Sequence, residues 1–127
     1  MNRSRHLGSL ERSVMNHLWA VDEPQTVRAV HDALCMQRVL AYTTVMTVLR
    51  RLAAKDLVVQ IRDDRAHRYL AAGSRDELVA ALMIDALDQI DDESDRHAAL
   101  VHFVAQVSIE EMRALRHALT LAERRPA

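Results

Sequence analysis

The chain opens with apolar residues at helical spacing, which predict a helix with one buried face formed by Leu7, Leu10, Val14, Leu18 and Val21. Ser9 is suited to cap the start of this helix, because its hydroxyl can accept a hydrogen bond from an amide of the first turn. Pro24 ends the pattern, since proline disfavours helical backbone in the residue before it. A second, short helix is predicted to begin after Thr26, with an apolar face of Val27, Val30 and Leu34.

A third helix is predicted from about residue 42 to residue 55, with an inward stripe of Val45, Leu49 and Leu52. The pattern then alternates, with Leu57, Val59 and Ile61 on one side and Val58, Gln60 and Arg62 on the other, which is typical of a half-buried strand. Asp63 and Asp64 are suited to a turn, and residues 67–71 alternate back, which predicts a β-hairpin. Three helices followed by a hairpin indicate a winged helix over residues 1–73.

The part from residue 74 to residue 127 is predicted to be helical. Ser74 with Glu77, and Ser108 with Glu111, form capping-box patterns that mark helix starts. The acidic stretch 91–95 is expected to be either a loop or the first turn of another helix, where acidic residues favour the helix dipole. So short a helical segment rarely has its own core. The simplest way to bury its apolar side chains is contact with a second copy of the chain. The residues expected to form this homodimer contact are Leu78, Leu82, Leu100, Phe103, Val104, Val107, Met112, Leu115 and Leu119. The alternative is that these helices fold back on the winged helix.

Composition supports a mainly α fold with one small hairpin. Only 3% of the residues are aromatic, and two glycines and two prolines leave few turn-formers, which argues against an all-β fold. The net charge of −1 hides an asymmetry: residues 1–73 carry +4 and residues 74–127 carry −5. We therefore expect any polyanion partner to bind the first part. The chain has no apolar run long enough to cross a membrane and starts with no signal-type segment, which predicts a cytoplasmic protein.

Catalytic and metal motifs are missing from the sequence. It contains no nucleophile elbow, zincin motif or phosphate-binding loop, which predicts a protein that is not an enzyme and needs no cofactor. The single cysteine, Cys35, excludes an internal disulfide and a cysteine-cluster metal site. His31 and Cys35 are spaced four residues apart and leave a metal sensor open as an alternative, but two ligands do not complete a zinc site. A protein-interaction module built on the same scaffold is a further alternative.

The third helix carries the residues expected to bind DNA. In a helix-turn-helix protein this helix lies in the major groove, and threonine can offer bases both a hydroxyl and a methyl group. Arginines on the second helix and on the hairpin are placed to hold the phosphate backbone. The predicted contacts are Thr43, Thr44, Met46, Thr47, Arg50 and Arg51 on the helix, and Arg28, Arg62, Arg65 and Arg68 around it.

Four segments of the chain, 7–11, 14–19, 26–28 and 40–49, together resemble the penicillinase repressor family of winged-helix transcriptional repressors. The resemblance implies a dimer that binds palindromic double-stranded operators ahead of β-lactamase or penicillin-binding-protein genes. It also implies a membrane sensor metalloprotease, responding to β-lactams, that leads to cleavage of the repressor within its dimerisation helices. The family is cut at an Asn-Phe bond, and the corresponding pair here is His102 and Phe103. Asp56 and the pair Asp63 and Asp64 stand where relatives commonly have glycine, and aspartate tolerates such backbone conformations better than most residues.

Overall fold

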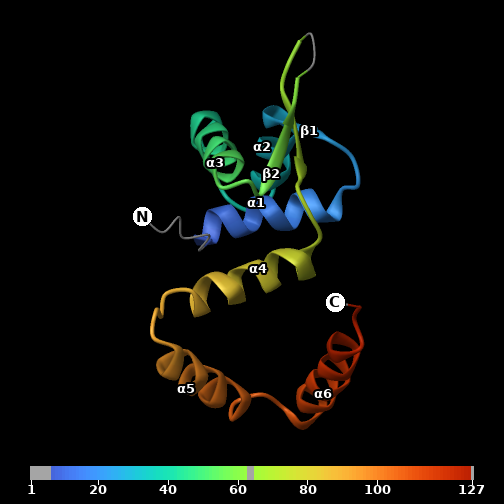
Figure 1. Ribbon diagram of the computed structural model, residues 1–127. Coiled ribbons are helices and arrows are strands. Elements are labelled where there is room, and N and C mark those ends of the chain that lie inside the picture. The colour runs from blue at the N-terminus through green and yellow to red at the C-terminus, as the bar shows by residue number, and fades with distance from the viewer. Residues whose placement is uncertain (1–6, 63–64, 127) are drawn as a thin grey trace. The chain divides into compact units, whose positions relative to one another are not determined.

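The computed structural model describes residues 7–62 and 65–126, and its secondary structure confirms the predicted mainly α fold. The elements, labelled in Figure 1, are α1 (Ser9–Ala20), β1 (Gln25–Thr26), α2 (Val27–Leu34), α3 (Tyr42–Ala54), β2 (Val58–Ile61), β3 (Arg68–Ala71), α4 (Arg75–Leu87), α5 (Glu93–Val104) and α6 (Ile109–Glu123). The chain forms two compact units that divide after Asp85. The turn predicted at Asp63 and Asp64 lies outside the described residues.

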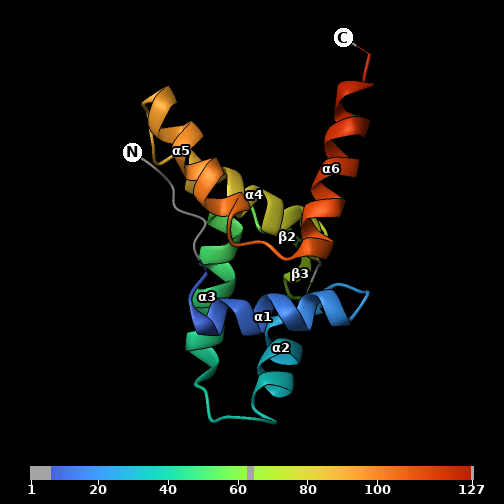
Figure 2. The same cartoon turned by 90° about the horizontal axis from the view of Figure 1, so that it is seen from below.

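The first unit is built around three short helices. The helix α1 crosses α2 and α3, which lie side by side, as Figure 2 shows. The side chains that meet between them are buried, and they include every member of the predicted stripe on α3. The fully enclosed residues of this core are Val14, Met15, Val30, Val45, Leu49 and Leu52. On α3 the buried residues recur at four- and three-residue spacing, so this helix has one face in the core and leaves the other exposed.

The start of α1 differs from the prediction. Gly8, not Ser9, is the N-cap, and Ser9 is the first helical residue. The carboxylate of Glu11 accepts a hydrogen bond from the Gly8 amide at 3.2 Å, so the third helical residue caps this end without a serine hydroxyl. The prediction for α2 is confirmed, since Thr26 Oγ1 accepts a hydrogen bond from the Ala29 amide at 3.1 Å.

The end of α3 is closed by a Schellman motif around Asp56. The Leu57 amide donates to the Leu52 carbonyl at 2.9 Å, and the Asp56 amide donates to the Ala53 carbonyl at 3.0 Å. Asp56 has a φ of 62°, the left-handed conformation that glycine adopts most easily. The turn also brings Leu57 against the core, where it is buried.

Replacing Asp56 by glycine is expected to raise the free energy of unfolding by about 0.5–1 kcal/mol. Relief of left-handed strain, about 1–2 kcal/mol, exceeds the backbone entropy cost of glycine, about 0.5–1 kcal/mol. Urea denaturation measures the difference, and Asp56→Val provides the control, since a β-branched residue here should lower stability. A less stable Asp56→Gly variant would show that the carboxylate itself stabilises the turn.

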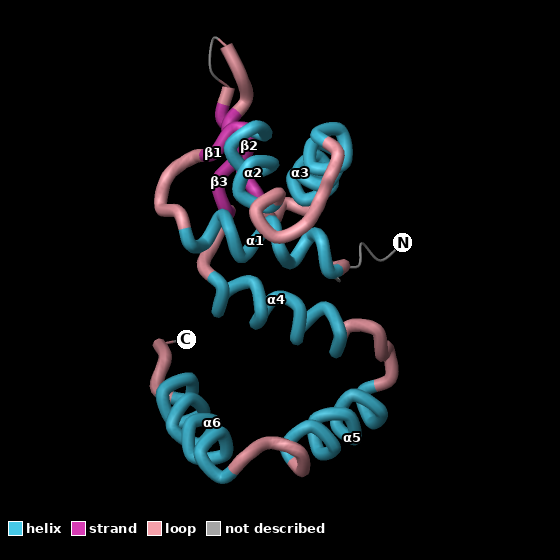
Figure 3. Tube along the Cα trace, turned by 180° about the vertical axis from the view of Figure 1, so that it is seen from behind, coloured by secondary structure: helices cyan, strands magenta, loops and turns pink. Residues whose placement is uncertain are grey.

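The small sheet has the strand order β1-β3-β2, with antiparallel pairing throughout (Figure 3). The predicted grouping of Leu57 with Val59 and Ile61 is wrong: Leu57 and Val58 are buried, whereas Val59 and Ile61 are exposed. Leu57 precedes the strand and is buried by the turn that ends α3, so it does not share the alternation of the strand. The inward face of β2 instead carries Val58 and Gln60, and Gln60 Nε2 donates to the hydroxyl of buried Tyr69 at 3.1 Å.

An ion pair joins α1 to the end of α3. Lys55 Nζ lies 3.0 Å and 3.2 Å from the two carboxylate oxygens of Glu11, and the side chain of Glu11 is 15% exposed. Burial opposes ionisation of Glu11, but hydrogen bonds from Lys55 and Gly8, with the charges of Lys55 and Arg51, hold its pKa below the usual 4.5.

This ion pair predicts a loss of stability in acid. Because the pKa of Glu11 is lower in the folded state, its contribution is fully present above pH 4.5 and is lost as the pH falls through the lowered pKa. Urea denaturation of the wild type and of Glu11→Gln between pH 6 and pH 3 should show two stability curves that converge as the pH falls. Parallel curves would contradict the assignment.

The beginning of α4 is held on the first unit. The indole Nε1 of Trp19 donates to the Gly73 carbonyl at 2.9 Å, and the guanidinium of Arg75 lies 5.1 Å from the centre of the Trp19 ring. The predicted capping box is confirmed, because the Ser74 amide donates to Glu77 Oε1 at 3.0 Å and the Glu77 amide donates to Ser74 Oγ at 3.4 Å. Leu78 is buried in the same core as the winged helix.

The second unit contains α5 and α6, and neither helix has a buried residue. The predicted capping box at α6 is confirmed, because Ser108 and Glu111 form reciprocal hydrogen bonds there. At α5, Asp92 is the N-cap, and Glu93 and Asp95 of the acidic stretch lie in the first turn. The guanidinium of Arg96 donates to the carbonyls of Leu87 and Ile90 and so fixes the turn before α5. No helix within residues 7–62 and 65–126 is long and apolar enough to cross a membrane.

Candidate nucleic-acid interface

The outward face of α3 carries three of the predicted DNA contacts. Thr43, Thr47 and Arg50 are exposed on the side opposite the core residues. The hydroxyl of Thr47 donates to the Thr43 carbonyl at 2.9 Å. Its proton is therefore engaged, and Thr47 presents an oxygen acceptor and a methyl group to any molecule that approaches this face.

One flank of α3 borders a hollow of about 500 Å³ between this helix, the start of α2 and the hairpin. We call it the wing-side cleft. It brings together four predicted contacts from three parts of the chain: Arg28, Met46, Arg50 and Arg65. The other residues that line it are Thr26, Val27, Tyr42, Gln60, Ala66, His67 and Tyr69.

The wing-side cleft is suited to an anion. Three arginines line it, and none of the described residues that line it is acidic. The amides of the first turn of α2 lie at the same place and carry the positive end of the helix dipole. Arginine forks and helix N-termini are the groups that hold phosphate oxygens in protein–DNA complexes.

Sequence reasoning missed His67, Gln60 and Tyr42 at this cleft. His67 is two residues from buried Tyr69, so the alternation of the hairpin could have placed both on the helix-facing side. Two other predicted contacts, Arg62 and Arg68, are exposed on the hairpin but do not line the cleft.

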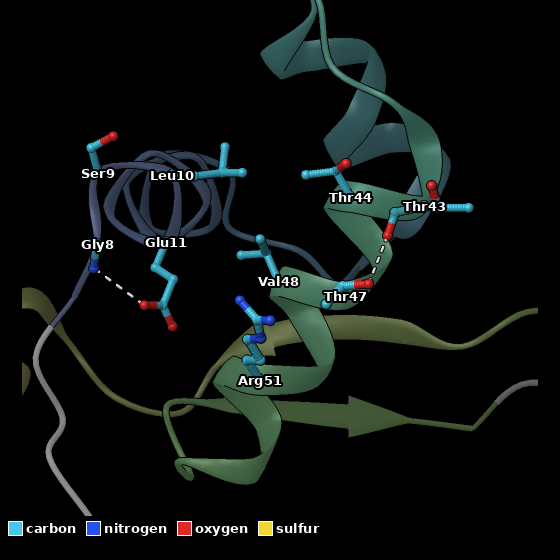
Figure 4. A pocket seen from close by; sticks show the side chains of 9 residues that line it. All are labelled: Gly8, Ser9, Leu10, Glu11, Thr43, Thr44, Thr47, Val48 and Arg51. Carbon is cyan, nitrogen blue, oxygen red and sulfur yellow. Dashed lines mark hydrogen bonds between the residues drawn. The ribbon is translucent and has the colours of Figure 1, made fainter.

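The other flank of α3 borders a second hollow, of about 550 Å³, which we call the α1-side hollow. Figure 4 shows Leu10 directed from α1 toward Thr44, and Glu11 and Arg51 pointing into the space between the helices. Arg50 and Arg51, neighbours in the sequence, thus lie on opposite flanks of the same helix. The complete lining is Gly8, Ser9, Leu10, Glu11, Thr43, Thr44, Thr47, Val48 and Arg51.

His31 and Cys35, the pair considered for a metal sensor, line neither hollow. Cys35 Sγ is 3.3 Å from His31 Nε2, and the same nitrogen is 2.7 Å from the Leu40 carbonyl oxygen. No group of three histidine, cysteine or carboxylate side chains among the described residues could hold a metal ion. His31 therefore helps to fix the turn before α3, and nothing in this geometry favours the metal alternative.

The predicted dimer contacts fall into two groups. Leu78 is buried in the core of the first unit, and Leu82 packs against that core. On α5 and α6, by contrast, Leu100, Phe103, Val104 and Leu119 are 45%, 42%, 36% and 60% exposed, and Met112 and Leu115 are half-buried. Val107, in the segment between the two helices, is half-buried as well. His102 and Phe103, the candidate cleavage pair, are exposed in the last turn of α5.

Comparisons with known proteins agree with the geometry. The sequence profile described as penicillinase repressor matches residues 7–120. Proteins named transcriptional regulator BlaI, from two strains of Mycobacterium tuberculosis, are 63% identical over 123 residues, covering 97% of this chain and 89% of theirs.

Solved structures support the fold. The hsRosR-S4 complex has a TM-score of 0.52 at 19% identity, covering 88% of this chain and 95% of that one. The regulator MepR of Staphylococcus aureus has a TM-score of 0.50 at 22% identity, covering 91% and 77%, and a mutant of it bound to an oligodeoxyribonucleotide has the same score. These likenesses agree with a winged helix followed by further helices. The profile match and the 63% identity show that the chain belongs to the penicillinase repressor family.

Proposed function

We propose that the protein is a homodimeric transcriptional repressor that acts in the cytoplasm and binds a palindromic DNA operator. The observation that carries the proposal is the wing-side cleft, where Arg28, Arg50 and Arg65 meet beside the exposed face of α3. The helix is about as wide as the major groove, and a duplex that accepts it brings a backbone strand along each flank. The arginines then contact phosphates while Thr43 and Thr47 face the bases.

Two copies of α3 would read the two halves of the operator. The exposed apolar side chains of α5 and α6 support a dimer, because neither helix has a core residue of its own. A second copy of the same chain offers the same apolar stripe, which a two-fold interface requires. Half-site centres are then about one helical turn of DNA apart, or a multiple of it.

Relief of repression by proteolysis remains part of the proposal. Membership of the family favours operators ahead of β-lactamase or cell-wall genes and a membrane sensor metalloprotease that responds to β-lactams. The bond between His102 and Phe103 is exposed and is followed by the short segment that links α5 to α6. A helix end needs little unwinding to enter a protease as an extended strand, and a cut there would separate the two apolar helices.

Selection of DNA tests the function directly. The purified full chain is mixed with sheared DNA of its own organism, and the bound fragments are sequenced and footprinted. Recovery of a palindrome upstream of a β-lactamase or cell-wall gene supports the whole proposal. A palindrome ahead of unrelated genes keeps the repressor and removes the antibiotic circuit. No sequence-selective recovery at low salt would make the chain an interaction module.

Replacing Thr47 by alanine is expected to weaken binding to the selected operator by about 1–3 kcal/mol and to leave random DNA unaffected. The reason is that the outward oxygen and methyl group of Thr47 are base-reading groups. Competition binding against operator variants measures the change. Thr120→Ala is a matched control, because Thr120 Oγ1 makes the same type of bond, to the Arg116 carbonyl, on a different helix. Equal weakening on operator and random DNA would show that Thr47 positions the helix and does not read bases.

A further inference from the structure

We propose that the α1-side hollow holds a phosphate of the DNA strand opposite the one held by the wing-side cleft, with Arg51 as its charged contact and Lys55 keeping Glu11 away from Arg51. This inference rests on the proposed function and adds a second backbone site on the other side of the reading helix. Two observations support it: α3 lies between two hollows, and the side chain of Arg51 is exposed and forms no hydrogen bond or ion pair with another described residue.

The helical geometry of α3 separates the two sites. Successive residues are about 100° apart around a helix, so Arg51 projects from a different side than Arg50. Thr44 shares the side of Arg51, whereas Met46 lies on the side of Arg50. A helix lying along the major groove has one strand beside each of these sides. Contacts from both flanks would fix the helix between the strands, which contacts from one flank alone cannot do.

The α1-side hollow has the groups that a phosphate needs. Arg51 is exposed and forms no hydrogen bond or ion pair with another described residue, so its five N–H donors are available. Thr44 lines the same hollow, and its hydroxyl can turn by rotation of the side chain to donate to a second phosphate oxygen. At about 550 Å³ the hollow has ample room for one phosphodiester group.

Glu11 lines the same hollow and would repel a phosphate if it stood alone. Its carboxylate instead accepts hydrogen bonds from Lys55 Nζ at 3.0 Å and 3.2 Å and from the Gly8 amide at 3.2 Å. Lys55 cancels the charge of Glu11, and the charge of Arg51 then leaves the hollow with a net positive charge. Without Lys55, Glu11 would turn to Arg51 and occupy the phosphate-binding group.

Neutral methylphosphonate linkages test the strand assignment. The probe is the selected duplex, made with one neutral linkage at a time on either strand, and binding is measured with the wild type, Arg51→Gln and Arg28→Gln. Each lost phosphate contact should make the slope of log affinity against log salt shallower by about 0.9. Arg51→Gln should become insensitive to neutral linkages at positions on one strand of a half-site, and Arg28→Gln at positions on the other.

The outcomes separate this inference from the proposed function. If the wild type binds no duplex selectively, the proposed function is wrong and the inference falls with it. If the wild type binds but Arg51→Gln keeps its full sensitivity, or loses the same positions as Arg28→Gln, only the inference is overturned.

A rescue experiment tests the role of Lys55 as a positioning residue. Lys55→Met should weaken binding to the duplex, because the freed Glu11 forms an ion pair with Arg51. It should also become insensitive to the same neutral linkages as Arg51→Gln. Adding Glu11→Gln to Lys55→Met should restore binding, although it does not restore the ion pair. Binding is measured below the melting transition of each variant. A double variant as weak as Lys55→Met, or a Lys55→Met variant that binds like the wild type, overturns this role.

Discussion

Replacing Val104 by aspartate is expected to convert the protein to a monomer and to weaken operator binding by about 10²–10⁴-fold. In a dimer, binding of one α3 helix to the duplex holds the second α3 helix at a high effective concentration near its half-site. A monomer loses this increase in affinity. The aspartate should prevent the two chains from associating, because burying an unpaired carboxylate against apolar side chains costs several kcal/mol. The winged helix should remain folded, since its core contains no residue of α5.

Sedimentation measures the oligomeric state, and a DNA titration measures affinity. Ala98→Asp is the matched control, since Ala98 is exposed on a different face of α5 and carries no predicted dimer contact. It should stay dimeric and bind normally. A dimeric Val104→Asp variant with normal affinity would show that the apolar stripes of α5 and α6 do not form the dimer. We would then infer that these apolar side chains pack against the winged helix of the same chain.

Removing both Arg28 and Arg50 is expected to weaken DNA binding of every sequence by on the order of a thousandfold at 0.1 M salt. If each subunit contacts about four phosphates, the slope of log affinity against log salt is near −7, and loss of two contacts per subunit brings it to about −3.6. Arg28→Gln with Arg50→Gln keeps the side-chain length and removes only the charge. Both residues are exposed, so the fold should be retained.

The measurement is a salt titration on the selected operator and on random DNA. Arg113 and Arg116 on α6 are also exposed and lie outside both hollows, and their glutamine double variant serves as the charge-matched control. That control should keep the wild-type slope. An unchanged slope for the Arg28 and Arg50 variant would remove the wing-side cleft from the interface.

Much of the fold could be predicted from the chain because helices with a strong apolar stripe need little context. The stripe of Val45, Leu49 and Leu52 is buried as expected, and Thr26 and Ser108 cap the helices they were expected to cap. The error at the start of α1 has a local cause: Gly8 is the N-cap because Glu11, three residues further on, reaches back to it. The pairing of the same carboxylate with Lys55, at the end of another helix, is a long-range contact that no local pattern shows.

The hairpin shows the same limit. Leu57 is apolar and next to the strand, so alternation counted it with Val59 and Ile61, yet it belongs to the turn that ends α3. The strand β1 has two residues, too few for any periodicity, and forms only because β3 offers an unpaired edge beside Gln25 and Thr26. Pairing partners of this kind are distant in sequence and carry no local signal.

By itself, the sequence determined which helices form, which of their faces is apolar, and that positive charge gathers in the first part of the chain, because spacing and residue type act locally. Only the tertiary structure decided how those residues share surfaces. It joined Arg28, Arg50 and Arg65 in one cleft, placed Arg51 in another hollow, and buried Leu78 in the first unit while leaving the stripes of α5 and α6 exposed. The physical reason is that a helical wheel fixes the direction of a side chain around its own axis, whereas its neighbours depend on how separate elements pack.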